Sequence, residues 1–184
     1  ENGTYVFDVK TPNTTLKNIE FNLPGRHNLS NALVALAMSV EYGLPTKQLA
    51  KALASYKGVK RRFSYHIKTD KIVFIDDYAH HPEEINAVHQ AVREMYPEKK
   101  VLAVFQPHLF SRTQDFATEF AKSLSQFDQI ILLDIYPARE LPIEGVTSSW
   151  LLSLIENSNK KLVNKEDLIS QIKQSNADVI LTIG

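Results

Sequence analysis

Apolar segments and helical patterns alternate along residues 72–184. Four short segments are apolar on both faces and rich in β-branched residues, which predicts buried strands at residues 72–75, 101–105, 130–135 and 179–183. Helical stretches are expected between these strands, at residues 82–95, 113–124, 148–156 and 166–174. This alternation indicates the α/β class: a doubly wound, mostly parallel sheet with helices on both sides.

Two hairpins are expected besides the parallel strands. Residues 5–9 and 16–23 have the aromatic and β-branched enrichment of short strands, and Thr11-Pro12-Asn13 is typical of the turn between them. Residues 63–68 could pair with the strand at 72–75, which would give the main sheet one antiparallel edge strand.

Two helices are expected between the first hairpin and the main sheet. Apolar residues recur from Leu29 at helical spacing until Gly43, which supplies a C-terminal stop. Thr46 is expected to be the N-cap of a second helix, which ends before the basic run at residues 57–62. We therefore expect a domain boundary in that run, between segments 1–58 and 59–184.

Composition narrows the class of function. Lysine plus arginine and aspartate plus glutamate both number 21 in 184 residues, so the net charge is zero and no overall field favours nucleic acid or an anionic membrane. No apolar run is long enough to cross a bilayer. The absence of cysteine excludes disulfides, thiol catalysis and cysteine-ligated metal, and fits a reducing cytoplasm. Any bound anion must therefore be held by local groups.

Polar residues follow three of the predicted strands. They are Asp76-Asp77-Tyr78-Ala79-His80-His81-Pro82, Gln106-Pro107-His108 and Tyr136-Pro137-Ala138-Arg139-Glu140. Ligands of doubly wound sheets bind beyond the carboxyl ends of the strands. This edge is therefore the expected binding edge.

The first cluster combines helix-start residues with unexplained polar ones. An N-cap at His81 and a first turn of Pro82, Glu83 and Glu84 fit the start of a helix, through the fixed φ of proline and the helix dipole. Two carboxylates and two imidazoles remain, and for these a binding role is the better interpretation. A zinc site is not favoured, because adjacent histidines point in different directions and no third ligand stands at a standard spacing.

The second cluster continues into Ser111 and Arg112. Ser111 and Gln114 could form a capping box, which explains both without a ligand. Arg112 would then stand in the first helical turn, where a cation is mildly unfavourable. A bound carboxylate or phosphate would reverse that penalty, held by Arg112, His108 and free helix amides. The alternative is a solvated surface arginine.

Five motifs occur in a fixed order over nearly the whole chain. They are Leu23-Pro24-Gly25-Arg26-His27-Asn28-Leu29-Ser30-Asn31-Ala32, Arg61-Arg62-Phe63, the tract 76–82, Phe105-Gln106-Pro107-His108 and the tract 136–140. Together they resemble the ATP-dependent Mur ligases of peptidoglycan synthesis. The tracts at 76–82 and 105–108 are the most distinctive of the five.

The resemblance implies a three-domain enzyme of the bacterial cytoplasm, with a UDP-binding domain, a central ATPase domain and a Rossmann-like C-terminal domain. Residues 1–58 would be the tail of the central domain, and residues 59–184 a C-terminal domain truncated at its end. The phosphate-binding pattern G-x-x-x-x-G-K-[ST] is absent, so the chain alone is expected to be inactive. Magnesium would bridge the ATP phosphates to ligands mostly outside this chain.

The same resemblance implies four ATP-binding residues. Asn28 and Asn31 match asparagines near the adenine, Arg62 matches an arginine that reaches the phosphates from an interdomain linker, and Asp77 matches an acid that binds the ribose hydroxyls. An N-cap role would also explain Asn28. Asparagine is a poor helix former at position 31, which favours a ligand role there.

For the amino-acid substrate, the resemblance implies that C-terminal loops surround its carboxylate. The expected ligands are His108, Arg112, Tyr78 and His81. Leu109 and Gln114 depart from the common pattern, since many relatives have arginine at these places. The carboxylate site is therefore leaner, or Arg112 carries most of it.

The implied reaction joins L-alanine to UDP-N-acetylmuramate, with ATP forming an acyl phosphate that the amine attacks. One rival is the related ligase that attaches a recycled murein tripeptide to the same sugar nucleotide, which usually lacks the run at 105–108. The other is a non-catalytic doubly wound binding module. The motif before residue 60 argues against that module.

Overall fold

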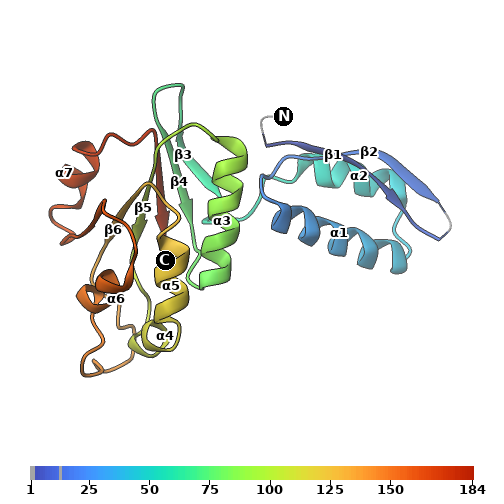
Figure 1. Cartoon of the computed structure of the whole chain (residues 1–184). Helices are drawn as coiled ribbons and strands as arrows, with labels where there is room; N and C mark the ends of the chain where they lie inside the picture. Colours follow the sequence, from blue (N-terminus) through green and yellow to red (C-terminus); the bar gives the residue numbers. More distant parts are fainter. Residues whose placement is uncertain (1–2, 13) are drawn as a thin grey trace. The chain divides into compact units, whose positions relative to one another are not determined.

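The computed structural model describes residues 3–12 and 14–184, so Asn13 of the turn predicted at Thr11-Pro12-Asn13 lies outside the described residues. The chain forms two compact units (Figure 1). The first contains the chain up to Val59 together with Gln90–Pro97, and the second contains Lys60–His89 together with Glu98–Gly184. Each unit has its own β-sheet.

A hairpin and two helices make up most of the first unit. Their bounds are Tyr5–Lys10 (β1), Thr15–Phe21 (β2), Arg26–Glu41 (α1) and Thr46–Ser55 (α2). β1 and β2 pair antiparallel, as the sequence predicts. Ile19 and Phe21 of β2 and Ala32 and Leu36 of α1 are the buried apolar side chains of these elements. The core of this unit is therefore small.

Both helices start differently from the prediction. α1 begins at Arg26, earlier than the apolar pattern indicates, because Gly25 takes the N-cap position with φ 94°. A side chain at Gly25 would be strained in that conformation, and its Cβ would lie 2.7 Å from the His27 ring. The N-cap prediction for Thr46 was wrong, because the extended residue that precedes α2 is Pro45 and Thr46 is already helical.

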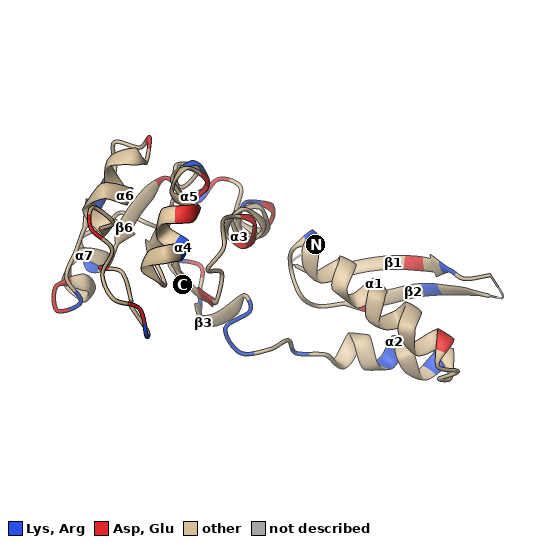
Figure 2. Cartoon of the chain, turned by 90° about the horizontal axis from the view of Figure 1, so that it is seen from below, with Lys and Arg blue, Asp and Glu red and all other residues tan. Residues whose placement is uncertain are grey.

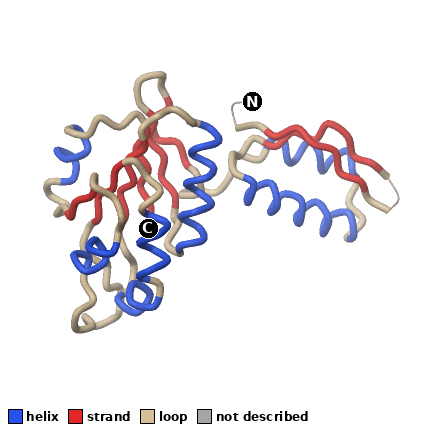
Figure 3. The backbone as a smooth tube through the Cα atoms, in the orientation of Figure 1, coloured by secondary structure: helices blue, strands red, loops and turns tan. Residues whose placement is uncertain are grey.

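A six-stranded sheet forms the centre of the second unit (Figure 3). Its strands are Ser64–Lys68 (β3), Val73–Asp77 (β4), Val101–Phe105 (β5), Gln129–Leu132 (β6), Lys160–Leu162 (β7) and Val179–Ile183 (β8). Their order is β3-β4-β8-β5-β6-β7. β3 runs antiparallel to β4 at one edge, and all other neighbours are parallel. The predicted α/β fold with one antiparallel edge strand is confirmed.

Helices pack on both faces of this sheet. They are Pro82–Met95 (α3), Phe110–Asp115 (α4), Ala117–Leu124 (α5), Ser148–Leu154 (α6) and Leu168–Lys173 (α7). On one face Phe105 of β5 meets Phe120 of α5, with ring centroids 5.4 Å apart. On the other, Leu102 and Val104 of β5 belong to a buried cluster against which Leu168 of α7 packs. Alternate residues of β5 thus face opposite helices, which explains why the strand is apolar throughout.

Three features of the second unit differ from the predicted elements. β7 was not expected, because this edge strand has three residues and two are lysines. The single helix expected at 113–124 is two helices, separated at Phe116 with φ −117° and ψ 22°. α4 has Leu109 in its N-cap position, so Ser111 and Gln114 do not form the expected capping box.

Charged residues are spread over both units. Figure 2 shows acidic and basic segments interspersed on the second unit, and blue segments along the connection between α2 and β3. That connection contains the basic run at residues 57–62. Of the described helices, none combines the length and the apolar character that a membrane span requires.

Candidate functional site

The loops that follow β5 and β6 are held against each other. Leu109 N donates to Tyr136 O at 2.9 Å, and Tyr136 N donates to Pro107 O at 2.8 Å. The His108 ring stacks on the Tyr136 ring, with centroids 5.5 Å apart. Two of the three polar clusters predicted at this edge of the sheet thus form one structure.

Asp77, at the end of β4, is only 3% exposed. Its carboxylate accepts hydrogen bonds from Phe63 N at 2.7 Å and from Ala79 N at 2.9 Å. Arg61 and Phe63 both have left-handed backbone, with φ of 57° and 49°, so Asp77 anchors a strained turn. Burial raises the pKa of Asp77, although the two amides and the charge of Arg62 act in the opposite direction.

The two arginines before β3 have different surroundings. Arg61 Nε donates to Asp76 Oδ2 at 3.1 Å, and the Arg61 guanidinium lies 4.8 Å from the centroid of the Tyr78 ring. Arg62 Nη1 lies 3.5 Å from Glu84 Oε1, and its side chain is 48% exposed. Arg61 is therefore tied to the end of β4, whereas Arg62 remains accessible.

Glu84, in the first turn of α3, binds the backbone of the two adjacent histidines. Its Oε2 accepts from His80 N at 2.9 Å and from His81 N at 3.2 Å. Partial burial acts to raise the pKa of Glu84, but these amides and the charges of His80 and Arg62 outweigh it and leave that pKa below its ordinary value. Glu84 therefore reaches back over the helix start as the glutamate of a capping box does.

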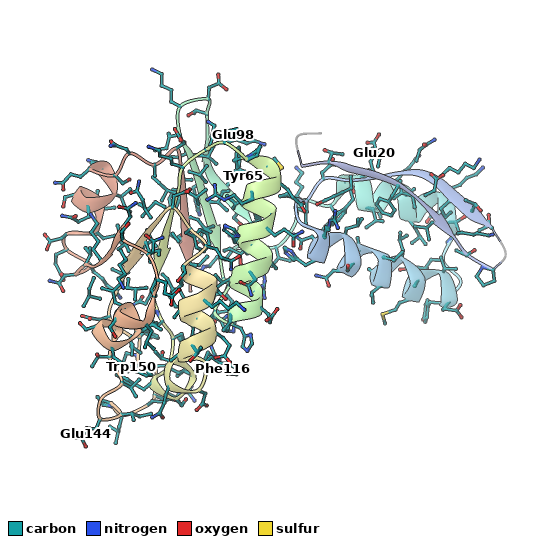
Figure 4. All side chains as sticks on the ribbon, in the orientation of Figure 1. Glu20, Tyr65, Glu98, Phe116, Glu144 and Trp150 are labelled. Atoms are coloured by element: carbon teal, nitrogen blue, oxygen red, sulfur yellow. The ribbon has the colours of Figure 1, made fainter. Side chains whose placement is uncertain are left out.

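The two histidine rings have different partners. His80 Nδ1 lies 2.8 Å from Tyr78 O, and the rings of His80 and Tyr78 are 4.7 Å apart. His81 Nδ1 accepts from Glu83 N at 3.4 Å, and the His81 ring meets Phe116 edge-on at 4.6 Å. Phe116 is labelled in Figure 4, at the end of the unit where α4 and α5 meet. His81 thus caps α3, as the helix-start interpretation predicts.

Arg112 presents one unsatisfied hydrogen-bond donor. Its Nη1 atom is buried and has no hydrogen-bond partner among the described residues. Burial lowers the pKa of His108, and the positive charges of Arg112 and His80 act in the same direction. An anion bound here would supply the partner that Nη1 lacks.

Glu140, in the loop after β6, binds the start of α4. Its carboxylate accepts from Ser111 N at 3.0 Å and from Ser111 Oγ at 2.5 Å. The Ser111 hydroxyl and amide lower the pKa of Glu140, which keeps the carboxylate ionised. This contact takes the place of the expected capping box and fixes the helical turn that carries Arg112.

The two predicted adenine ligands lie in α1 of the first unit. Asn28 Nδ2 donates to Pro24 O at 2.7 Å, so Asn28 fastens the turn before α1 and is not its N-cap. Asn31 is exposed one helical turn further on. The other six predicted site residues lie in the second unit: Arg62, Asp77, Tyr78, His81, His108 and Arg112.

Three residues of the site, Glu84, Glu140 and Tyr136, have no role in the predictions from sequence. For Glu84 a signal existed, since His80 precedes it by four residues and such pairs share one face of a helix start. For Glu140 none existed, because its partner Ser111 is 29 residues away in sequence. Tyr136 belonged to a motif, but nothing local predicted its stacking on His108.

Comparison with known proteins identifies the family. A family model described as "Mur ligase, glutamate ligase domain" matches residues 61–184. The chain belongs to the Mur ligase family. The motifs at 76–82 and 105–108, which resemble this family, lie within the matched range.

Mur ligases of known name match the chain over its whole length. The UDP-N-acetylmuramate–L-alanine ligases of Flavobacterium psychrophilum and Flavobacterium johnsoniae are 70% and 66% identical to it over 184 residues. The crystal structure of the UDP-N-acetylmuramate–alanine ligase of Thermotoga maritima has a TM-score of 0.71 and 26% identity, covering 92% of this chain and 36% of that one. The chain spans 41% of the length of each Flavobacterium relative.

Proposed function

We propose that this chain is part of an ATP-dependent ligase of the bacterial cytoplasm that joins L-alanine to UDP-N-acetylmuramate. The relatives that match it over its whole length carry that name. The observation that carries the proposal is the buried Nη1 of Arg112, which lacks a partner at the edge of the sheet where ligands of this fold bind. A substrate carboxylate is the partner that the proposal assigns to it.

In this proposal Arg112 and His108 bind the alanine carboxylate, with Tyr78 and His81 beside them. Arg112 supplies the charge, and the stacked His108 ring supplies a neutral hydrogen-bonding group, because its pKa is lowered. Leu109 adds no charge, so Arg112 carries most of the site. Positioning of the amine against an activated carboxyl group is the contribution expected of such loops.

The proposal also assigns four ligands of ATP. Arg62, exposed before β3, would meet the phosphates, and Asn28 and Asn31 would meet the adenine. Asp77 would meet the ribose with the acceptor capacity that its two amide bonds leave free. The magnesium that ATP requires would bridge its phosphates to ligands mostly outside this chain.

The reaction begins with transfer of the γ-phosphoryl group of ATP to the carboxylate of UDP-N-acetylmuramate. The amine of alanine then attacks the acyl phosphate, and phosphate leaves from a tetrahedral intermediate. This chain would bind the alanine and part of the ATP, and would hold them during closure of the active site. The chain alone is expected to show no ligation and no ATP hydrolysis, because it lacks the phosphate-binding loop.

The alternative within the family is the ligase that attaches a recycled murein tripeptide to the same sugar nucleotide. The run Phe105-Gln106-Pro107-His108 supports the alanine enzyme, since the tripeptide ligases usually lack it. A direct comparison of L-alanine with a murein tripeptide as the amine substrate of the full-length enzyme would separate them.

The test of the proposal is Arg112→Ala in the full-length enzyme, with alanine and ATP varied separately. Because a hydrogen bond to a charged group contributes roughly 1.5 to 3 kcal/mol, the KM for alanine should rise about ten- to a hundredfold and the KM for ATP should stay the same. Arg112→Lys should rescue only partly, since an ammonium cannot form the two parallel bonds of a guanidinium.

A matched control for that test is Arg139→Ala, which removes an exposed arginine of the neighbouring loop. It should leave both KM values unchanged. If Arg139→Ala raised the KM for alanine and Arg112→Ala did not, the carboxylate would bind at Arg139, and Arg112 would not be a ligand of the alanine.

A further inference from the structure

His80 has a ring nitrogen that the described protein leaves available. Its Nδ1 lies 2.8 Å from the carbonyl oxygen of Tyr78, and a carbonyl oxygen can only accept a hydrogen bond. Nδ1 therefore carries the proton, and in the neutral ring Nε2 has a free lone pair. The side chain is 26% exposed, so a small substrate can reach it.

The adjacent histidine, His81, is held in the opposite tautomer. His81 Nδ1 accepts from the backbone N–H of Glu83, so in the neutral ring the proton of His81 is on Nε2. Of these two neighbouring rings, His80 alone can accept a proton at Nε2. Backbone hydrogen bonds thus make Nε2 of His80 a proton acceptor and Nε2 of His81 a hydrogen-bond donor.

Glu84 supports a positive charge on His80. Its Oε2 lies 3.5 Å from His80 Nδ1 and is held in place by the backbone amides of His80 and His81. The charged or titratable groups facing His80 are Glu84, Tyr78 and His108, with Arg62 beyond Glu84. A carboxylate behind the ring and an open nitrogen in front are the arrangement of a general base.

His80 also lies near the proposed alanine site. Its ring lies 4.7 Å from that of Tyr78, a predicted ligand of the alanine, and the charges of His80 and Arg112 both act to lower the pKa of His108. The carboxylate and the ammonium of an α-amino acid are separated by a single carbon. A carboxylate bound by Arg112 and His108 would therefore bring the ammonium toward His80.

We propose that His80 is the base that activates the amine of the amino-acid substrate. His80 Nε2 takes one proton from the ammonium, and the nitrogen lone pair then forms a bond to the carbonyl carbon of the acyl phosphate. The C–O bond to phosphate breaks, and the second proton of the amine leaves with the phosphate. This inference rests on the proposed function, because it requires an acyl phosphate and an amine.

The test compares two nucleophiles in the full-length enzyme with ATP and UDP-N-acetylmuramate. Alanine is an ammonium at neutral pH and needs a base, whereas hydroxylamine is uncharged and needs none. His80→Asn keeps an amide nitrogen near the position of Nδ1 and removes the base. Alanine-dependent turnover should fall about 10²- to 10⁴-fold, and hydroxamate formation with hydroxylamine should change less than about threefold.

Two further variants complete the design. His80→Ala should regain part of its alanine-dependent turnover when imidazole is added. His66→Asn, the same substitution at an exposed histidine of β3, should change neither reaction.

The outcomes separate this inference from the proposed function. Equal loss of both reactions in His80→Asn would make His80 a structural residue and overturn the inference, and so would full alanine turnover in that variant. Absence of hydroxamate with the wild-type enzyme would overturn the proposed function itself.

Discussion

Two buried polar groups at the same edge of the sheet differ in their hydrogen-bond partners. Asp77 is buried and both of its oxygens accept backbone hydrogen bonds, whereas the buried Nη1 of Arg112 has no partner among the described residues. The first arrangement stabilises the fold, because it satisfies two amides and holds a strained turn. The second costs stability until an anion binds. Asp77 is therefore fixed by the fold, whereas Arg112 is open to an anion, and the loops after β4 and β5 both belong to the proposed site.

Asp77 therefore contributes mainly to stability and Arg112 mainly to binding, although both lie at the same edge of the sheet. Asp77 is the last residue of a buried parallel strand, and Arg112 follows the end of another such strand by seven residues. Variants of each should move the free energy of unfolding in opposite directions. Trp150, the only tryptophan of the chain, lies in α6 and reports on the unit that contains both residues.

The largest effect is expected for Asp77→Ala. It leaves the amides of Phe63 and Ala79 without their acceptor and releases the left-handed turn, so the free energy of unfolding should fall by about 2–5 kcal/mol. Urea unfolding of the chain followed by Trp150 fluorescence measures it. Asp76→Ala is the comparison at the same strand end, because among the described residues the Asp76 carboxylate accepts from the side chains of Arg61 and Thr182 and not from backbone amides, so its loss should cost less. A loss below about 0.5 kcal/mol for Asp77→Ala would show that the two amides find other acceptors.

A smaller effect of opposite sign is expected for Arg112→Met. This change keeps most of the apolar stem and removes the buried Nη1 donor that lacks a partner, so the free energy of unfolding should rise by about 1 kcal/mol. The same urea titration measures it, and in the full-length enzyme the variant should bind alanine poorly. A fall in stability of more than about 1 kcal/mol would mean that Arg112 is part of the fold, and the comparison with Asp77 would fail.

Glu140→Gln should have a modest effect that depends on pH. The pKa of Glu140 is lowered in the folded chain, so its stabilising contribution is present above the ordinary pKa of a glutamate and is lost as the pH falls through the lower folded value. The stability difference between wild type and variant should therefore shrink below about pH 4. The pKa of Asp77 is raised, so Asp77 changes the free energy of unfolding with pH in the opposite sense. Because Asp77 is present in both proteins, its contribution cancels in the difference between them. A difference that grows in acid would contradict this prediction.

The smallest effect on stability is expected for Arg62→Ala. The side chain is 48% exposed and lies 3.5 Å from Glu84, and exposed ion pairs contribute little. The free energy of unfolding should change by less than about 0.5 kcal/mol. In the full-length enzyme, the affinity for ATP should fall more than the affinity for alanine. Titration calorimetry with an ATP analogue measures that loss. Unchanged ATP affinity would place the phosphates away from Arg62.

Much of the main sheet was predictable because its strands are buried on both faces. Such strands have apolar residues at every position, and the bounds of β5 and β8 agree with the prediction. β7 could not be found this way, since an exposed edge strand of three residues needs no apolar run. The break between α4 and α5 at Phe116 leaves the apolar pattern almost unchanged, so periodicity does not reveal it.

The sequence was enough to predict where the site lies, but not which of its side chains contact one another. The polar residues after β4, β5 and β6 indicated the binding edge, and the dipole argument singled out Arg112. The contact between Ser111 and Glu140 joins loops 29 residues apart, and no local pattern reports it. The bonds of Asp77 depend on left-handed backbone at Phe63, which a phenylalanine rarely adopts.

The position of β8 has a consequence for the order of folding. β4 and β5 do not pair with each other, and both form their hydrogen bonds with β8, which follows them by more than 70 residues. During synthesis these strands emerge first and expose unpaired edges until β8 leaves the ribosome. Closing such distant parallel pairs is slow. A nascent chain arrested before β8 would thus be a substrate for chaperones, and the sheet would close in one late step.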